Sequence, residues 1–243
     1  MENQRIYKNL LLHVPHSSTH FPDFSNYSFE KLDNDEKQLI DYFTDEIFIP
    51  KEKSEHIKHV VFPYCRLFCD VERLAHDPLE KMGMGIVYNR DLVKSGGRFY
   101  SPIPERREAL KHYIDYHAMV SNLILDMGDK TLLIDCHSFS SIPTLLNPTT
   151  SDVDICIGFN DDETCPDKAV ISNVVHHFES LGYKVGINQP FSNSKTFNAP
   201  LEYHSIMIEV NKKHYMNEQT IEKSDDFVKL SKDIQSLYKM LIS

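Results

Sequence analysis

The chain has 243 residues, enough to bury a substantial core, and no Gly/Ser/Pro-rich linker divides it, so we expect a single domain over residues 1–243. Its 26 basic and 36 acidic residues give a formal net charge of −10, which argues against nucleic acid or an anionic membrane as the main partner. No apolar run approaches the roughly 20 residues of a membrane span, the first residues do not resemble a signal peptide, and the cysteines form no CxxC pair. We therefore expect a cytoplasmic protein with reduced thiols.

Two short apolar runs end in histidine and are predicted to be buried strands. The first covers residues 10–14 and leads to His16, and the second leads to His137. Because the carboxyl ends of parallel strands meet at the edge of an α/β sheet where ligands bind, we expect these two imidazoles to lie close together. Each suits a metal ligand, a general base or an oxyanion donor, or else a hydrogen-bonded core histidine. His13 and His20 are the alternatives to His16 in the first loop.

Residues 33–48 are predicted to form a helix, because apolar side chains recur on one face from Leu39 to Ile47. Asp41 and Asp45 are four residues apart and lie roughly opposite that stripe. They are therefore either two solvated carboxylates or, if their face looks into the crevice, candidate ligands.

Residues 59–71 are predicted to form a strand that is broken by Pro63. Arg66, Asp70 and Arg73 lie among the apolar neighbours of this segment. An unpaired guanidinium near an apolar sheet costs several kcal/mol, so we expect each arginine to pair with a carboxylate of the chain or of a substrate.

The second half of the chain alternates between helices and strands. A helix is predicted over residues 105–126, where His117 falls on the apolar stripe and is either a bonded core histidine or part of a site. Glu209 is set in an apolar run, where a carboxylate needs a partner or a raised pKa, and this is the environment of a general base. Further strands are predicted at 153–159, 183–188 and 205–210, and further helices at 166–181 and 224–242. This alternation indicates an α/β protein with a largely parallel or mixed sheet.

Six motifs, in this order along the chain, resemble those of the N-formylglutamate amidohydrolase family. They are Pro15-His16-Ser17-Ser18, Asp41-Tyr-Phe-Thr-Asp45, Arg66-Leu-Phe-Cys-Asp70-Val-Glu-Arg73, Glu105-Arg106-Arg107 with Tyr116-His117, Ile134-Asp135-Cys136-His137-Ser138-Phe139, and Ile208-Glu209-Val210. The resemblance covers about residues 10 to 216, and the ordered set is more specific than any one motif.

That family is similar in fold to the zinc carboxypeptidases and aspartoacylases. The resemblance implies a three-layer α/β/α domain with a mostly parallel or mixed central sheet and a divalent metal, Zn²⁺ or another ion such as Co²⁺, at its carboxyl edge. By position it implies His16 and His137 as metal ligands and Glu209 as the base. Arg66 and Arg73 match the arginine pair that holds the substrate carboxylate.

The chain departs from the family pattern at the carboxylate ligand. Thr19 stands three residues after His16, where related zinc enzymes carry glutamate, so this ligand must come from elsewhere. We expect Asp45 to supply it, with Asp41 and Asp70 as alternatives.

The substrate contacts also differ from the pattern. Glu72 stands where the family carries asparagine, before Arg73, which alters the pairing available to a substrate. Arg106 and Asn188 are the further candidates for substrate binding. We expect the loop around residues 188–196 to decide which acyl amino acid is accepted.

The resemblance implies hydrolysis of N-formyl-L-glutamate to formate and L-glutamate by a metal-bound water, with Glu209 as general base and Arg66 or His117 stabilising the oxyanion. The expected partner is a small acidic N-acyl amino acid, while the native metal and the oligomeric state stay open. The alternatives are hydrolysis of another N-acyl amino acid or of a carboxy-terminal peptide bond, or a non-catalytic carboxylate-binding or metal-binding module. A thiol hydrolase using Cys136 and His137 is disfavoured, because adjacent strand residues point to opposite faces.

Overall fold

A six-stranded sheet forms the centre of the computed structural model, which describes residues 6–144 and 151–242. The strands are β1 (Asn9–Val14), β2 (Ile57–Val61), β3 (Thr131–Phe139), β4 (Ile155–Gly158), β5 (Val185–Ile187) and β6 (His204–Asn211). They lie in the order β2-β1-β3-β6-β4-β5. β1, β2, β3 and β6 run parallel, whereas β4 is antiparallel to β6 and parallel to β5. The predicted α/β class with a mostly parallel, mixed sheet is confirmed.

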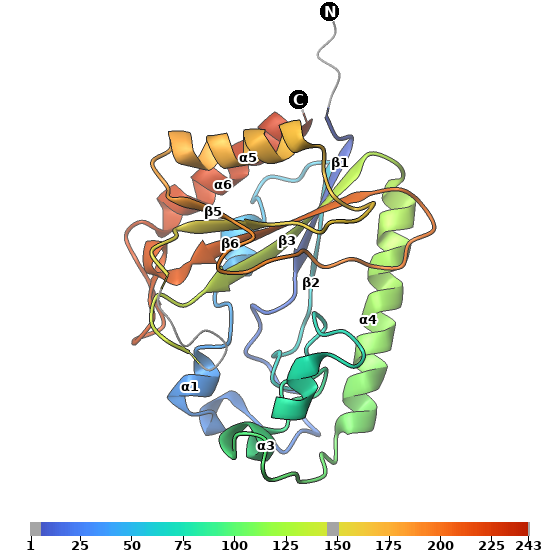
Figure 1. Ribbon diagram of the computed structural model, residues 1–243, viewed down its shortest axis with the longest axis vertical. Helices are drawn as coiled ribbons and strands as arrows, with labels where there is room; N and C mark the ends of the chain where they lie inside the picture. The colour runs from blue at the N-terminus through green and yellow to red at the C-terminus, as the bar shows by residue number, and fades with distance from the viewer. Residues whose placement is uncertain (1–5, 145–150, 243) are drawn as a thin grey trace, which may run out of the picture.

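Helices cover both faces of the sheet. They are α1 (Asn34–Lys37), α2 (Thr44–Phe48), α3 (Arg90–Lys94), α4 (Arg106–Met127), α5 (Lys168–Ser180) and α6 (Phe227–Ile242), with 3-10 helices at Phe29–Lys31, Pro78–Met82 and Lys212–His214. The long α4 lies along one side of the sheet, and α2 and α6 pack together on the other (Figure 1). Among the described residues, no helix combines the length and the apolar character needed to cross a membrane. Residues 1–5, where we expect no signal peptide, lie outside the described part.

The pairing register of the parallel strands gathers polar side chains on one face of the sheet. His13 on β1 pairs with Asp135 on β3, and His137 on β3 pairs with Glu209 on β6. Paired residues of neighbouring strands share a face, and so do residues two apart on one strand, such as Asp135 and His137. All nine residues of β3 are buried, so these polar groups lie inside the core. The carboxyl ends of β1, β2, β3 and β6 point toward the segments that carry α1 and α3 (Figure 1).

The prediction of one helix over residues 33–48 is wrong. Two short helices, α1 and α2, are separated by turns at residues 38–43, and Phe43 has a left-handed backbone with a φ of 62°. Side chains from distant parts of the chain bind the carbonyls of this segment, which compensates for the missing helical hydrogen bonds.

The segment after β2 also differs from the prediction, because residues 67–71 form turns instead of continuing the strand. The backbone N–H of Phe68 returns to the carbonyl of Cys65 at 2.9 Å, which closes a turn. This turn places Arg66 and Asp70 next to each other, with Arg66 Nη2 2.8 Å from Asp70 Oδ2. The chain therefore presents a charged pair beside the sheet rather than a further strand.

Candidate metal centre

Two histidines and one aspartate converge at the carboxyl edge of the sheet. His16 follows the end of β1, His137 lies on β3, and Asp41 lies in the turns between α1 and α2. Asp41 Oδ2 is 3.6 Å from His16 Nδ1 and 3.2 Å from His137 Nδ1, and one possible ligand atom of each residue lies within 4.8 Å of the others. All three side chains are buried, and the backbone N–H of Asp41 donates to the carbonyl of His16 at 3.0 Å.

The opposite ring nitrogen of each histidine is bound to a carboxylate. His16 Nε2 lies 2.8 Å from Asp70 Oδ1, and His137 Nε2 lies 3.0 Å from Asp135 Oδ1. A carboxylate in this position fixes the tautomer that leaves a lone pair on Nδ1 and raises its basicity, as in metal-ligating histidines. Within the described part of the chain, His16 Nδ1 is buried without a hydrogen-bond partner. Two histidine nitrogens and one carboxylate oxygen therefore fit a divalent ion such as Zn²⁺ and leave a fourth coordination position open.

Asp135 holds a second histidine in addition to His137. Its Oδ1 lies 2.8 Å from His13 Nδ1, and its Oδ2 accepts the backbone N–H of Lys195 at 2.9 Å. Glu72 Oε1 lies 3.3 Å from the same His13 nitrogen, and burial together with the charge of Asp135 raises the pKa of Glu72. His13, Glu72 and Asp135 also bring possible ligand atoms within 4.8 Å. Because Asp135 Oδ1 lies within hydrogen-bond distance of both His13 Nδ1 and His137 Nε2, we interpret this group as a support for His137.

Glu209 lies beside His137 in the pairing register and on the same face of the sheet. Its side chain is buried, and Oε2 has no hydrogen-bond partner among residues 6–144 and 151–242. Burial raises the pKa of Glu209 to about 8, against the lowering effect of His137 and with a further increase from Asp41. A carboxyl group with such a pKa can take up and release a proton near neutral pH.

The two arginines differ in how far the chain already satisfies them. Arg66 is buried and donates to Asp70 Oδ2 at 2.8 Å and to the carbonyl of Leu39 at 3.1 Å. Arg73 approaches Asp70 Oδ2 only through Nε, at 3.6 Å, and this atom has no hydrogen-bond partner among the described residues. Arg73 therefore keeps more of its guanidinium available for a carboxylate ligand than Arg66 does.

A cavity of about 400 Å³ adjoins these groups. Its polar lining includes His16, Asp41, Arg66, Glu72, Arg73, His137, Glu209 and Lys212. Its apolar lining includes Leu39, Leu79, Phe139, Phe191 and Met207. Convergent polar groups with apolar walls are typical of sites for small molecules.

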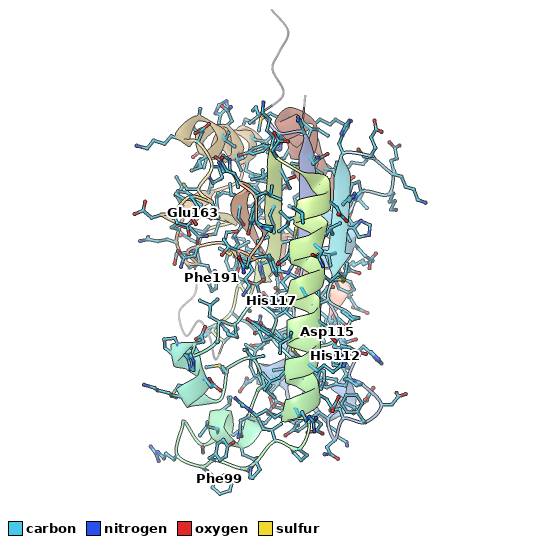
Figure 2. The ribbon with its side chains drawn as sticks, turned by 90° about the vertical axis from the view of Figure 1, so that its right-hand side faces the viewer. Phe99, His112, Asp115, His117, Glu163 and Phe191 are labelled. Atoms are coloured by element: carbon cyan, nitrogen blue, oxygen red, sulfur yellow. The ribbon has the colours of Figure 1, made fainter. Side chains whose placement is uncertain are left out.

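Besides Asp45, three residues predicted for the site do not line this cavity. His117, midway along α4 (Figure 2), has Nε2 2.9 Å from the carbonyl of Val71, and burial lowers its pKa to about 4. Arg106 pairs with Glu80 at 2.7 Å on the surface. Asn188 Oδ1 accepts two backbone N–H groups in and beside its own loop. Each of the three side chains is thus bound to another part of the chain, and its role in the site stays a prediction.

Asp41, and not the expected Asp45, lies beside the two histidines, so Asp41 becomes the carboxylate proposed for the metal centre. Asp45 is half-buried in the first turn of α2, where burial raises its pKa. A continuous helix would place Asp41 and Asp45 on one face, whereas the turns at residues 38–43 bring Asp41, and not Asp45, beside the two histidines.

Two supporting residues were not identified from the sequence. Asp135 had a detectable signal, because residues two apart on a strand share a face and Asp135 therefore lies beside His137. Lys212 had no such signal, since lysine is rarely buried. It is 2% exposed, and its Nζ donates to the carbonyls of Gln38 and Ile40, both at 2.7 Å.

Comparison with known proteins gives one family. A family model described as N-formylglutamate amidohydrolase matches residues 8–216. An N-formylglutamate amidohydrolase from Ralstonia eutropha JMP134 is similar in structure, with a TM-score of 0.74 and 19% identity over 98% of this chain and 93% of that one. A gene product of Agrobacterium tumefaciens gives a TM-score of 0.62 and 18% identity over 98% and 91%. No curated protein sequence matches the chain, and at these identities the two structures confirm the predicted fold.

Proposed function

This chain belongs to the N-formylglutamate amidohydrolase family, and we propose that it hydrolyses N-formyl-L-glutamate to formate and L-glutamate with a bound divalent metal ion. The observation that carries this proposal is the convergence of His16 Nδ1 and His137 Nδ1 on Asp41, with a carboxylate behind each imidazole. Three protein ligands with an open position are typical of catalytic rather than structural zinc sites.

The proposed reaction divides the work between the metal ligands and Glu209. His16, Asp41 and His137 would hold the ion, which supplies a Lewis acid that polarises the formyl carbonyl and lowers the pKa of a water molecule to near 7. Glu209 takes a proton from the attacking water at Oε2, the atom without a partner among the described residues. As the C–N bond breaks, Glu209 returns this proton to the departing amine nitrogen.

Arg73 is the proposed anchor for a substrate carboxylate, because a guanidinium can pair with a carboxylate through two parallel hydrogen bonds. Arg66 is proposed to support the metal ligand His16 instead, because it donates a hydrogen bond to Asp70, and Asp70 is bound to the ring of His16. Phe139 and Phe191 line the same cavity and exclude bulk water, which strengthens the charge interactions inside it.

A second candidate function is the hydrolysis of an N-acyl amino acid with an uncharged side chain. Glu72 favours it, because its carboxylate lines the same cavity as Arg73 and repels the second carboxylate of N-formylglutamate. A comparison of kcat/KM for N-formyl-L-glutamate and N-formyl-L-leucine separates the two candidates, since each predicts preference for its own substrate.

Formate release by the chelator-stripped protein, measured before and after Zn²⁺ or Co²⁺ is restored, tests the proposed reaction. We expect release only in the presence of metal. If the metal-loaded protein releases formate from neither formyl amino acid, the amidohydrolase proposal is wrong. Release that is equal with and without metal would retain the reaction class and contradict the metal dependence.

Glu209→Gln separates the base from the metal ligands. We expect formate release to fall by about 10²–10⁴-fold, the usual contribution of a general base, while Co²⁺ affinity is retained. Glu202→Gln, at an exposed position, is the matched control and should leave both properties unchanged. Turnover at the wild-type rate in Glu209→Gln would contradict the assignment of the base.

A further inference from the structure

Two buried cations bind the three backbone carbonyls that immediately precede Asp41. Lys212 Nζ donates to the first and third carbonyls of residues 38–40, each at 2.7 Å. Arg66 Nη1 donates to the middle one at 3.1 Å. The two cations come from distant parts of the chain, Arg66 from the turns after β2 and Lys212 from the 3-10 helix after β6. The segment before the candidate metal ligand Asp41 is thus hydrogen-bonded to two other segments of the chain.

The N–H groups of residues 38–40 donate to carbonyls of α1, but among the described residues no backbone N–H donates to the carbonyls of 38–40, which accept from Lys212 and Arg66 instead. This segment lies between α1 and α2, and Phe43 just after it has a left-handed backbone. The backbone of Asp41 has two further contacts, from its N–H to the carbonyl of His16 at 3.0 Å and from Thr44 Oγ1 to its carbonyl at 2.8 Å. The backbone of Asp41 is therefore held by groups from α2 and from the loop after β1.

Lys212 binds two of the three carbonyls, whereas Arg66 binds one. Its ammonium group is almost fully buried, and burial of a charge is unfavourable unless its donors are satisfied. Two of its three N–H groups are satisfied by the carbonyls, and Asp41 and Glu209 are among the carboxylates that act on its charge. Arg66 cannot replace Lys212, because it reaches only the middle carbonyl and is also bound to Asp70.

We propose that Lys212 is a positioning residue of the metal centre, which places the carboxylate of Asp41 between His16 and His137 by holding the carbonyls of residues 38 and 40. The inference rests on the proposed metal-dependent function and extends it to a residue that binds the backbone before a ligand rather than the ion. It predicts that loss of the Lys212 ammonium weakens metal binding even where the fold is retained.

Co²⁺ binding to the chelator-stripped protein, followed by visible absorption and by competition with a chelator, tests this role. Lys212→Met removes the donors and keeps most of the apolar stem, and Lys212→Gln keeps an NH₂ group that can reach one carbonyl. We expect Co²⁺ affinity to fall about 10–100-fold in Lys212→Met, as for other groups that orient a metal ligand, and to fall less in Lys212→Gln. The cobalt absorption spectrum should change as the carboxylate moves.

Lys213→Met is the matched control, because Lys213 is the next residue and pairs with Asp154 at 2.7 Å near the surface. It should retain the wild-type affinity and spectrum. A purely structural role for Lys212 predicts a lower melting temperature of the metal-free protein with unchanged cobalt affinity and spectrum, and that result would overturn the inference. If Lys212→Met does not fold, Lys212→Gln decides the question by the same readouts.

The experiment also separates this inference from the proposed function. A wild-type chain that binds no cobalt contradicts the metal centre itself, and the role of Lys212 with it. A wild-type chain that binds cobalt no more tightly than Lys212→Met contradicts only the role of Lys212.

Discussion

Asp41 and Asp45 are close in sequence but lie in different environments, and this difference predicts the effect of changing each. Asp41→Asn replaces the carboxylate between His16 and His137 with a neutral amide, a weaker ligand for a divalent ion. We expect Co²⁺ affinity to fall by more than about 100-fold, beyond the range for groups that only orient a ligand. Asp45→Asn removes the same charge from α2 and should leave the affinity unchanged, as measured by cobalt titration.

Both substitutions remove one carboxylate and change the net charge equally. A difference in Co²⁺ affinity between the two variants therefore reports the position of the carboxylate and not the net charge. If Asp45→Asn weakened cobalt binding more than Asp41→Asn, the carboxylate ligand would be Asp45, as expected from the sequence, and the assignment of Asp41 would be wrong. Equal, small losses in both variants would mean that neither carboxylate binds the ion.

The sequence predicts the two histidines of the candidate site directly, whereas it offers Asp41 only as an alternative to Asp45. His16 follows the end of β1 and His137 lies near the end of β3, and parallel strands bring such ends to one edge of a sheet. The position of Asp41 depends on Lys212 and Arg66, which lie far away along the chain. Local periodicity does not report contacts of this range, so it predicts a helix that the structure interrupts.

The same limit applies to whole elements. The strands β1, β3 and β6 were predicted because strands buried on both faces are continuous apolar runs, and α4 and α6 were predicted from their helical periodicity. The antiparallel direction of β4 could not be predicted, because its apolar residues would be buried equally in either direction. Residues 67–71 have the apolar pattern of a buried strand, because their side chains are buried in the turns as they would be in a strand.

The α6 helix offers a test of how an element on the far side of the sheet supports the fold. Ile234 is fully buried on its inner face, whereas Val228 on the same helix is 59% exposed. Ile234→Ala leaves a cavity, so we expect the free energy of unfolding to fall by about 2–5 kcal/mol. Val228→Ala should change it by no more than about 0.5 kcal/mol, because an exposed site loses little packing.

Urea unfolding of the two α6 variants provides the comparison, and formate release per folded molecule is the accompanying control. α6 packs against α2, on the side of the sheet opposite α4, and does not line the cavity. Activity per folded molecule should therefore stay at the wild-type level in both. Similar stability losses in the two variants would contradict the assignment of the inner face.

At the scale of the whole molecule, the candidate metal centre gathers negative charge in the interior of the protein. The carboxylates of Asp41, Asp70, Glu72, Asp135 and Glu209 are gathered around two imidazoles, in a chain whose formal net charge is already −10. Arg66, Arg73 and Lys212 compensate for part of this charge. Like charges in a low-dielectric interior destabilise the folded state, and a divalent cation among them reduces the repulsion.

Removal of the metal ion should therefore destabilise the whole molecule. An ion present at 100 times its Kd stabilises the folded state by about 2.7 kcal/mol if it does not bind the unfolded chain. Chains of this size shift by roughly 2–4 °C per kcal/mol, so we expect Tm to fall by about 5–10 °C when Zn²⁺ is chelated. Asp41→Asn should show little of this shift. A wild-type Tm that is unchanged by chelation, at a Zn²⁺ concentration that supports formate release, would contradict preferential binding of the ion by the folded chain, because any ion bound only to the folded state raises Tm.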